Sequence, residues 1–359
     1  MTDRTVCVFG TGKIGTGKGL QTLRLLNINV DFYCDNDRDK WGKTICDDIK
    51  CIPPATLCAL KNVTCYVMMK TEYCDEVLKQ LERLEIKDII RWEEIQYCDQ
   101  VVDNFYMKIP LASKLCTRRT TPPPSNIVPV HNVKSKQIAI YTCITGNYDK
   151  FIEPCCFDNA VFDYYLISDN KPNDLSVFQW IDSKTVIPDE IRNHARRNRY
   201  VKILGNELFS EYCYSVYIDG NMCIIRDVSK FVQKIGKYGI ALYTHSSNKD
   251  CIYAEGMDCI EQKKDSADVI YNQMQKYRRE GLPKHYGLFA CGLIVRENNN
   301  PMVKTIMREW WREVYMYSYR DQLSFTYVLW KNGIQAKHIG FLGCDIYKSQ
   351  YIKFLSYHS

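Results

Sequence analysis

The segment from Thr117 to Gln137 most constrains the fold, because it divides the chain into two parts. Its three consecutive prolines, Pro122 to Pro124, fix the backbone φ angle and remove hydrogen-bond donors, and its flanks carry no apolar period. We interpret residues 117–137 as a semi-rigid linker. A chain of 359 residues is long enough for two domains, so we predict one domain over residues 1–116 and another over residues 138–359.

The composition excludes several classes of protein. Hydrophobic residues make up 46% of the chain, enough to bury real cores, which excludes a disordered chain. The 48 Lys and Arg exceed the 42 Asp and Glu by only six, and they are spread along the chain, whereas a nucleic-acid-binding protein usually has a dense basic stripe. The sequence has no apolar run of membrane-spanning length and no signal-peptide pattern. We therefore expect a cytoplasmic protein with no nucleic-acid partner and no transmembrane segment.

The residues before the linker alternate between strand and helix patterns, which predicts a small parallel α/β unit. The predicted strands are 6–9, 30–33, 65–69 and 88–90, and the predicted helices are 13–26 and 72–84. A second α/β series begins after the linker, with a strand over 138–143.

A glycine motif follows the first predicted strand. Gly10, Gly12 and Gly15 fit the pattern G-x-G-x-x-G at the start of a helix, and Asp35 follows twenty residues later at the end of the next strand. Glycines let a backbone approach a pyrophosphate, a helix N-terminus favours its charge, and the acid can bind ribose hydroxyls, so the motif predicts a nucleotide in this domain. An equally weighted alternative is a tight turn without a ligand. A competing P-loop frame ending at Lys18 is disfavoured, because Gly19 stands where a Ser or Thr should hold magnesium.

The stretch VFGTGKIG to VDFYCDNDRDKWGKTI also resembles the small Rossmann-like domains that are joined to bacterial polysaccharide-synthesis enzymes. Such a domain is expected to hold a nucleotide or sugar nucleotide, or to serve only for docking. The residues after Asp35 offer no base for hydride transfer, so we look for the chemistry in the second domain.

The second domain contains a strand that ends in an acidic turn. The apolar run YSVYI leads into Asp219, Gly220 and Asn221, and a second apolar run follows. An acid at the end of a buried strand is held rigidly at a sheet edge. The turn has the D-x-D shape of sugar-nucleotide transferases with an amide in place of the second acid, and its oxygens suit a hard divalent cation and a diphosphate. Taken alone, D-G-N is also a common turn sequence.

Further polar segments accompany this turn. Thr142, Thr145, Gly146 and Tyr148 belong to a strand and loop, YTCITGNYD, and Asp169 ends the next strand. The segment HARRNRYVK predicts a basic helix before the D-G-N strand, where Arg192, Arg196, Arg199 and Lys202 form either a diphosphate clamp or a solvated face. A nucleotide-sugar site needs loops that hold the base and ribose, cations that hold the diphosphate, and an acidic turn. Since these segments supply all three, we predict that they contact the donor.

The segments YTCITGNYD, ISDN, YSVYIDGNMCI, THSSNKDCIYAEG, YRREGLP and SYRDQLSFTYVLW resemble the glycosyltransferase-like family of the plant mucilage-related and turgor-regulation-defect proteins, from about residue 138 to residue 330. The resemblance implies a GT-A-type domain, a nucleoside-diphosphate sugar donor, and Mn²⁺ or Mg²⁺ bound by Asp219 and Asn221. Because an amide binds a divalent cation less strongly than a carboxylate, Asn221 leaves the metal dependence open.

Three further groups of residues are candidates for the site. Asp321 and Gln322, in RDQLSF, resemble the D-Q pair of glycogenin-like transferases, which lies beside the anomeric carbon; the alternative is an acid that caps a helix. His338 resembles the late histidine that completes the metal shell in those enzymes, or is ordinary polar structure. His245 and Glu255 bracket a segment that could meet the acceptor, with Glu255 as a general base or as a surface acid.

We therefore predict an α/β protein with an N-terminal Rossmann-like parallel sheet and a C-terminal GT-A-type domain. Its expected function is sugar transfer from a nucleoside-diphosphate donor to a glycan or glycolipid, in bacterial-type polysaccharide or glycoconjugate synthesis. The alternatives are a non-catalytic sugar-nucleotide-binding protein and an NAD-dependent oxidoreductase acting through the first domain.

Overall fold

The computed structural model describes residues 4–109, 121–124, 127, 129, 137–146, 151, 153–154, 158, 160–245 and 249–355. The chain forms two compact units, residues 1–112 and 113–359. Most of the predicted linker, 117–137, lies outside the described residues, so its exact limits stay a prediction. The predicted α/β class, with a first unit on a mostly parallel sheet followed by a second α/β unit, is confirmed.

The first unit is built on a six-stranded sheet in the order β3-β4-β2-β1-β5-β6. All of its described pairings are parallel except that of β3 with β4. The strands are β1 (Thr5–Phe9), β2 (Phe32–Cys34), β3 (Thr44–Cys46), β4 (Ile49–Ile52), β5 (Val63–Val67) and β6 (Asp88–Arg91). The helices are η1 (Ile14–Lys18), α1 (Gly19–Leu25), η2 (Arg38–Lys40), η3 (Pro54–Ala59), η4 (Thr71–Tyr73), α2 (Cys74–Arg83), α3 (Trp92–Ile95) and α4 (Asp99–Lys108).

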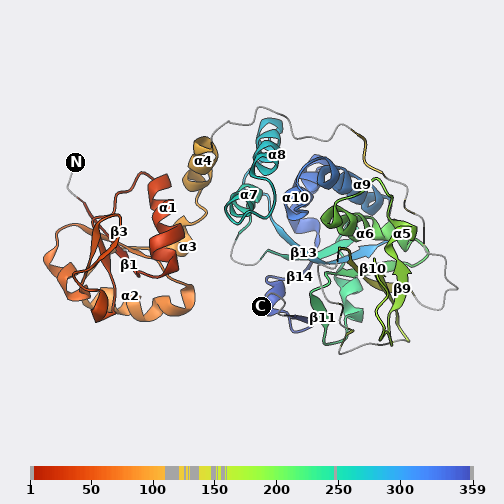
Figure 1. The fold of residues 1–359 in the computed structure, drawn as a ribbon, viewed down its shortest axis with the longest axis horizontal. Helices are drawn as coiled ribbons and strands as arrows, with labels where there is room; N and C mark the ends of the chain where they lie inside the picture. Colours follow the sequence, from red (N-terminus) through yellow and green to blue (C-terminus); the bar gives the residue numbers. More distant parts are fainter. Residues whose placement is uncertain are drawn as a thin grey trace. The chain divides into compact units, whose positions relative to one another are not determined.

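Alternation along β1 explains why helices cover both faces of this sheet. Cys7 and Phe9 join one apolar cluster with Val77 of α2, whereas Val6 and Val8 join another cluster with residues of α1. Successive side chains of a strand point to opposite faces, so α1 and α2 lie on opposite sides of the sheet (Figure 1). The sequence predicts one helix over 13–26, but the structure breaks it at Gly17, which has a non-helical backbone.

The second unit is built on a seven-stranded sheet in the order β14-β12-β13-β10-β7-β8-β9. Only β13 runs antiparallel to its neighbours β10 and β12. The strands are β7 (Ile138–Ile144), β8 (Phe162–Ser168), β9 (Gln179–Asp182), β10 (Tyr214–Ile218), β12 (Ile240–Thr244), β13 (Phe289–Glu297) and β14 (Gly340–Gly343), with β11 (Met222–Ile224) and β15 (Ile352–Phe354) forming a separate two-stranded sheet. The helices are α5 (Ser183–Val186), α6 (His194–Leu208), η5 (Ser229–Lys234), α7 (Ile252–Glu261), α8 (Ala267–Glu280), α9 (Pro301–Met316), α10 (Gln322–Lys331), η6 (Ala336–His338) and η7 (Ile346–Lys348).

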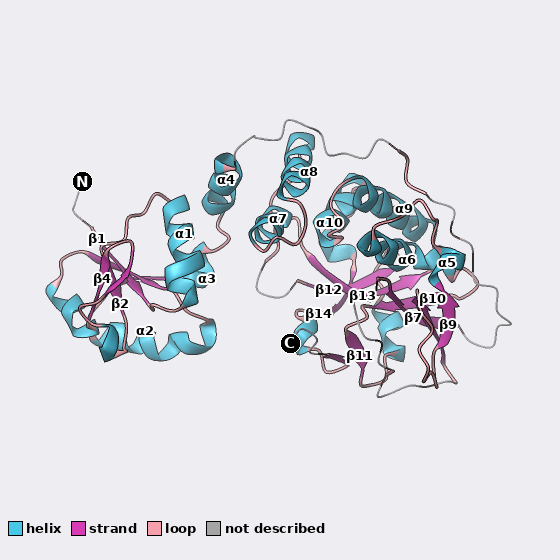
Figure 2. Cartoon of the chain, viewed as in Figure 1, coloured by secondary structure: helices cyan, strands magenta, loops and turns pink. Residues whose placement is uncertain are grey.

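The centre of this sheet is buried on both faces. Every residue of β7 and β8 is buried, as expected for parallel strands covered on both sides. Figure 2 shows α6, α9 and α10 together over one face of the sheet. The apolar run that follows Asn221 forms strand β11, which pairs with β15 instead of extending the main sheet. None of the helices described is long and apolar enough to span a membrane.

Candidate active site

Three parallel strands of the second unit end at the same edge of the sheet, and each is followed by a predicted site residue. Thr145 and Gly146 follow β7, Asp169 follows β8, and Asp219 follows β10. Ligands of open α/β sheets bind outside the carboxyl ends of such strands. A cleft of about 780 Å³ lies here, a volume in the usual range for small-molecule sites.

The cleft brings together residues that the sequence analysis selected from five separate segments. Its lining includes Thr145, Gly146, Arg199, Lys202, Asp219, Asn221, His245, Asp321 and Gln322. The structure places Thr142, Asp169, Arg196, Glu255 and His338 outside this lining. Tyr148 lies outside the described residues.

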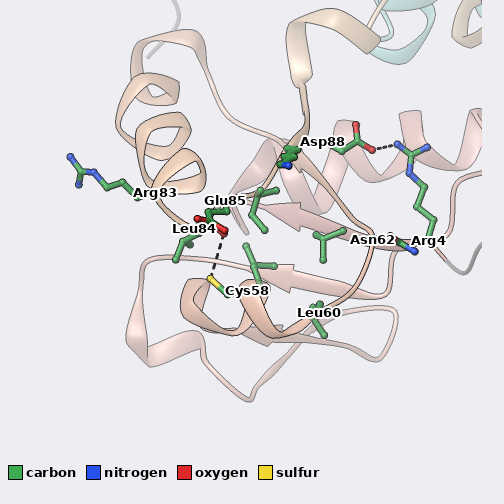
Figure 3. A pocket seen from close by; sticks show the side chains of 12 residues that line it. Arg4, Cys58, Leu60, Asn62, Arg83, Leu84, Glu85 and Asp88 are labelled. Carbon is green, nitrogen blue, oxygen red and sulfur yellow. Dashed lines mark hydrogen bonds and ion pairs between the residues drawn. The ribbon is translucent and has the colours of Figure 1, made fainter.

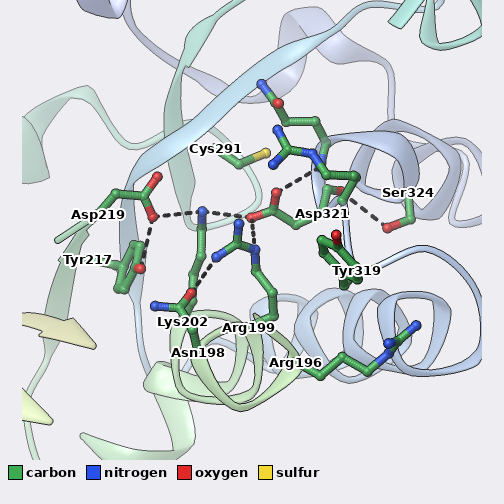
Figure 4. Close-up of polar contacts among 12 residues, drawn as sticks. Arg196, Asn198, Arg199, Lys202, Tyr217, Asp219, Cys291, Tyr319, Asp321 and Ser324 are labelled. Carbon is green, nitrogen blue, oxygen red and sulfur yellow. Dashed lines mark hydrogen bonds and ion pairs between the residues drawn. The ribbon is translucent and has the colours of Figure 1, made fainter. Parts of the chain in front are cut away.

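Lys202 joins the two acids of the site. Its ammonium lies 3.1 Å from Oδ1 of Asp219 and 2.6 Å from Oδ2 of Asp321 (Figure 4). Its side chain is only 2% exposed, so burying the cation depends on these two partners. Because α6 places residues 198, 199 and 202 within one turn of each other, Asn198 and Arg199 face the same cleft.

Asp321 is held in place by hydrogen bonds and ion pairs. It is the N-cap of α10, and its Oδ1 accepts a hydrogen bond from the backbone N–H of Gln322 at 3.1 Å. Its Oδ2 also lies 3.2 Å from Nε of Arg199. Burial would raise the pKa of Asp321, but Arg199 and Lys202 outweigh burial and hold the pKa well below its ordinary value. The capping role is therefore present, and it accounts for only one of the two carboxylate oxygens.

Asp219 and Asn221 suit a divalent cation in part. Oδ1 of Asp219 accepts hydrogen bonds from Lys202 and, at 2.9 Å, from the hydroxyl of Tyr217. Oδ2 has no hydrogen bond within the described part of the chain, and Asn221 lines the cleft two residues later. These oxygens could contribute to a metal site that a diphosphate completes. Across the residues described, no three His, Cys, Asp or Glu side chains converge as in an all-protein metal site.

The predicted place of His338 in a metal shell does not agree with its position in the structure. It belongs to η6 and lies with its ring 6.1 Å from the ring of Tyr238, away from the cleft lining. The position of a single histidine after a strand does not determine where the following turn carries it. The late polar residue that does reach the cleft is Tyr347 of η7.

The predicted role of Glu255 as a general base also does not agree with the structure, because its carboxylate is not accessible. It is buried in α7, with Oε2 2.8 Å from Nζ of Lys249 and 3.6 Å from Nε2 of His245. Burial would raise the pKa of Glu255, but Lys249 and His245 outweigh burial and lower it. Of the predicted pair, His245 is the residue that lines the cleft.

Three predicted donor residues position the site instead of lining it. Asp169 accepts hydrogen bonds from the backbone N–H of Gly146 at 2.6 Å and from Ser183 at 2.5 Å, and so fixes the loop after β7. Arg196 donates to the backbone carbonyl of Tyr317 at 2.6 Å. Thr142 is buried within β7.

The sequence analysis missed several residues of the cleft. Cys291 and Gly292 enter from β13, and a Cβ on Gly292 would lie 2.3 Å from the side chain of Met222. The glycine within the apolar run FACGLIV was a usable signal for close packing. Other missed residues are His194, Asn198, Gln262, Lys263, Lys264, Tyr319, Arg320, Tyr347 and Phe354.

The glycine turn of the first unit is a tight structural turn with one open position. Gly10 has a φ of +104°, and a Cβ on Gly15 would lie 1.8 Å from the carbonyl oxygen of Gly10. A Cβ on Gly12 would meet nothing within 4 Å. Oδ2 of Asp35 accepts a 2.9 Å hydrogen bond from the N–H of Thr11, so Asp35 anchors the turn itself. The turn is thus formed as predicted, and whether it binds a nucleotide stays a prediction.

A hollow of about 740 Å³ lies elsewhere in the first unit (Figure 3). It is lined by Arg4, Val63 and Asp88 at the amino ends of β1, β5 and β6, whereas Gly10 follows the carboxyl end of β1. It is therefore distinct from the predicted nucleotide turn.

Comparisons with known proteins give a family match and several distant structural matches. The family model for the TOD1/MUCI70 glycosyltransferase-like domain matches residues 127–351. Curated protein sequences give no match. Similar solved structures include the bifunctional glycosyltransferase WbbM, with TM-score 0.39 and 16% identity over 76% of this chain, and the chain spans about half (52%) of WbbM. Mouse xyloside xylosyltransferase 1 has a TM-score of 0.35 and 8% identity, and the match covers 55% of this chain and 83% of that one. The galactosyltransferase LgtC has a TM-score of 0.29 and 14% identity, and the match covers 58% of this chain and 72% of that one.

Proposed function

Since this chain belongs to the TOD1/MUCI70 glycosyltransferase-like family, we propose that it transfers a sugar from a nucleoside-diphosphate donor to a glycan or glycolipid acceptor. The observation that carries the proposal is the buried ammonium of Lys202 between Asp219 and Asp321. It joins the acid at the end of β10 to the acid at the start of α10, two positions selected independently from the sequence.

Each part of the cleft has a role in this reaction. The loop at Thr145 and Gly146 and the amide of Asn198 would receive the nucleoside, and Asp219 with Asn221 would face the diphosphate. Mn²⁺ or Mg²⁺ bound to the oxygens of Asp219 and Asn221 would neutralise the leaving diphosphate. Arg199 contributes a fixed positive charge from α6, and its planar guanidinium suits phosphate oxygens.

The reacting sugar would lie beside Asp321 and Gln322. Arg199 and Lys202 keep Asp321 ionised at neutral pH, so its negative charge is present without a proton being removed. A fixed carboxylate stabilises an oxocarbenium-like centre, where positive charge develops during transfer. Gln322 lines the same wall of the cleft and donates weakly to the carbonyl of Phe289 at 3.4 Å, which leaves its amide oxygen for a sugar hydroxyl.

A thermal-shift screen of nucleoside diphosphates and their sugars, with and without Mn²⁺, tests the donor assignment. A ligand at about 100 times its Kd stabilises the folded state by about 2.7 kcal/mol, which raises the melting temperature by several degrees. We expect one nucleoside diphosphate to do so and Mn²⁺ to increase the shift. Asp219→Ala should remove the increase due to Mn²⁺, while Asp189→Ala, an exposed acid outside the cleft, should keep it. A shift that is the same in both variants would contradict the role of Asp219.

A further inference from the structure

The cleft carries more positive charge than its own acids neutralise. Five cationic side chains and two carboxylates line it, a formal excess of three positive charges. Arg199 and Lys202 are paired with Asp219 and Asp321. The other three cations are Lys263, Lys264 and Arg320, which have no ion pair among the residues described; together we call them the basic wall.

Hydrogen bonds between two distant segments fix the basic wall. The hydroxyl of Tyr319 donates to the backbone carbonyl of Lys264 at 2.7 Å. Asp265 accepts from the hydroxyl of Ser318 at 2.7 Å and from the N–H of Tyr319 at 3.1 Å. The turn after α7 is thereby attached to the residues that precede α10. The backbone segments that carry the three cations are therefore fixed next to each other.

Arg320 supplies a second, independent indication of a ligand. Its Nε is buried and has no hydrogen-bond acceptor within the described residues. A buried donor without a partner is costly. The side chain lines the cleft, where its guanidinium could pair with an anionic group. Arg320 also directly precedes Asp321, so a ligand on the wall lies next to the place of the reacting sugar.

The wall and the D-G-N turn lie on different sides of Lys202. Figure 4 shows Asp219 and Asp321 on opposite sides of Lys202, with Tyr319 on the side of Asp321. The D-G-N turn, where the donor diphosphate is placed, is thus across the cleft from the segment that holds the wall. A metal ion at that turn would add further positive charge, so the donor diphosphate alone does not account for the excess.

An exposed aromatic pair lines the same cleft. Tyr347 is 67% exposed, and its ring stacks on that of Phe354 with centroids 4.4 Å apart. Phe354 belongs to β15, which pairs with β11 directly after the D-G-N turn. A rigid aromatic face at the edge of a polar cleft suits the apolar face of a sugar ring.

We propose that the acceptor is an acidic saccharide, with its carboxylate or phosphate on the basic wall and a sugar ring on Tyr347. This inference rests on the proposed function, because it takes Asp219 and Asp321 as the donor side. The wall supplies charge-assisted hydrogen bonds to the anionic group, and Tyr347 supplies contact that is indifferent to charge. The two features therefore make separable contributions to acceptor binding.

Calorimetric titration of the full chain tests the proposal, with the chain saturated with Mn²⁺ and with the nucleoside diphosphate, such as UDP, that gives the largest shift in the thermal-shift screen. The matched probes are cellobiouronate against cellobiose for a carboxylate, and glucose 6-phosphate against glucose for a phosphate. We expect at least one acidic probe to bind about tenfold more tightly than its neutral partner. Combined Lys263→Gln, Lys264→Gln and Arg320→Gln should remove that preference, whereas Tyr347→Ala should weaken acidic and neutral probes alike. The control replaces Lys230, Lys304 and Lys337, three lysines outside the cleft lining, with Gln and should keep the preference.

The outcomes separate this inference from the proposed function. Equal binding of acidic and neutral probes, with UDP still bound, overturns the acidic acceptor alone. If the triple variant loses UDP affinity as much as it loses acidic-probe affinity, the wall belongs to the donor diphosphate and the inference is wrong. If no nucleoside diphosphate of the thermal-shift screen binds the wild-type chain, the donor assignment fails and the inference fails with it.

Discussion

Asp321 performs two tasks that a sequence cannot separate. Oδ1 caps α10, and Oδ2 forms buried ion pairs with Lys202 and Arg199. A helix cap alone contributes about 1 kcal/mol to stability, whereas breaking a buried ion pair costs about 3–5 kcal/mol. The contacts of Oδ2 therefore dominate, and they lie on the side of the residue that faces the cleft.

We predict that Asp321→Asn lowers the turnover number about 100-fold. The amide preserves the cap and the shape of the side chain but removes the negative charge beside the reacting sugar, a loss of about 2.7 kcal/mol in the barrier. The variant should also unfold more easily by about 3 kcal/mol, because Lys202 and Arg199 lose a buried partner. The measurement is the turnover number per folded molecule at saturating donor, together with chemical unfolding. Normal turnover in the folded fraction would reduce Asp321 to a structural residue.

The same variant gives a pH test with a defined sign. The pKa of Asp321 is lowered in the folded state, so its contribution to stability is complete above the unfolded value of about 3.9 and is lost as the pH falls below it. The stability difference between wild type and Asp321→Asn should thus be largest at neutral pH and shrink in acid. A difference that stays constant well below a pH of about 3.9, where both proteins are still folded, would show that the ion pairs do not depend on the charge of Asp321.

The sequence predicted those site residues that lie at the end of a strand or at the start of a helix. The apolar run before Asp219 and the helical pattern after Asp321 both identify a position where a side chain leaves a buried element. The roles of Glu255 and His338 could not be predicted in this way. The partner of Glu255 is Lys249, from a loop, and the turn that reaches the cleft lies beyond β14, so both depend on tertiary packing.

The basic wall illustrates the same limit. Lys263 and Lys264 are separated from Arg320 by more than fifty residues. Hydrogen bonds that Ser318 and Tyr319 donate to Asp265 and to the carbonyl of Lys264 bring the two segments together. Nothing in the local pattern of either segment indicates this contact. In the first unit, by contrast, the glycine turn was predictable because its constraints are local.

The glycine turn yields a prediction for that unit. Gly15→Ala should destabilise it by several kcal/mol, because the new Cβ would lie 1.8 Å from the carbonyl oxygen of Gly10. Gly12→Ala should change stability by about 1 kcal/mol or less, since its Cβ has open space around it. Chemical unfolding of the full chain, followed by hydrogen exchange of β1 and β2, measures both effects.

Gly12 also provides the matched test of a ligand at this turn. If a nucleotide approaches the open backbone, Gly12→Val should remove its binding from an otherwise stable unit. Binding of the same nucleotide at full strength by Gly12→Val would exclude this turn as its site. Equal loss of stability in the Gly12 and Gly15 variants would contradict the packing described here.

For the whole molecule, all parts of the proposed transfer site belong to one unit. The cleft, both acids and Lys202 all belong to residues 113–359, and the family match of residues 127–351 covers the cleft residues from Cys143 to Tyr347. The first unit contributes a separate glycine turn and a separate hollow. We therefore propose that the donor's sugar-phosphate bond is cleaved in the cleft between β7, β10 and α10.

Release of nucleoside diphosphate from a panel of nucleoside-diphosphate sugars, measured with Mn²⁺ and without an added acceptor, tests this claim most directly. We expect slow hydrolysis of at least one donor by the wild-type chain, and at least 100-fold less per folded molecule by Asp219→Ala. The rate is taken per folded molecule because buried Lys202 loses one of its partners in this variant. Asp189→Ala, outside the cleft, should match the wild type. If donors bind in the thermal-shift screen but none is cleaved, with or without acidic and neutral sugars present, the protein binds sugar nucleotides without transferring them. If Asp219→Ala cleaves the donor at the wild-type rate, the chemistry takes place at another site.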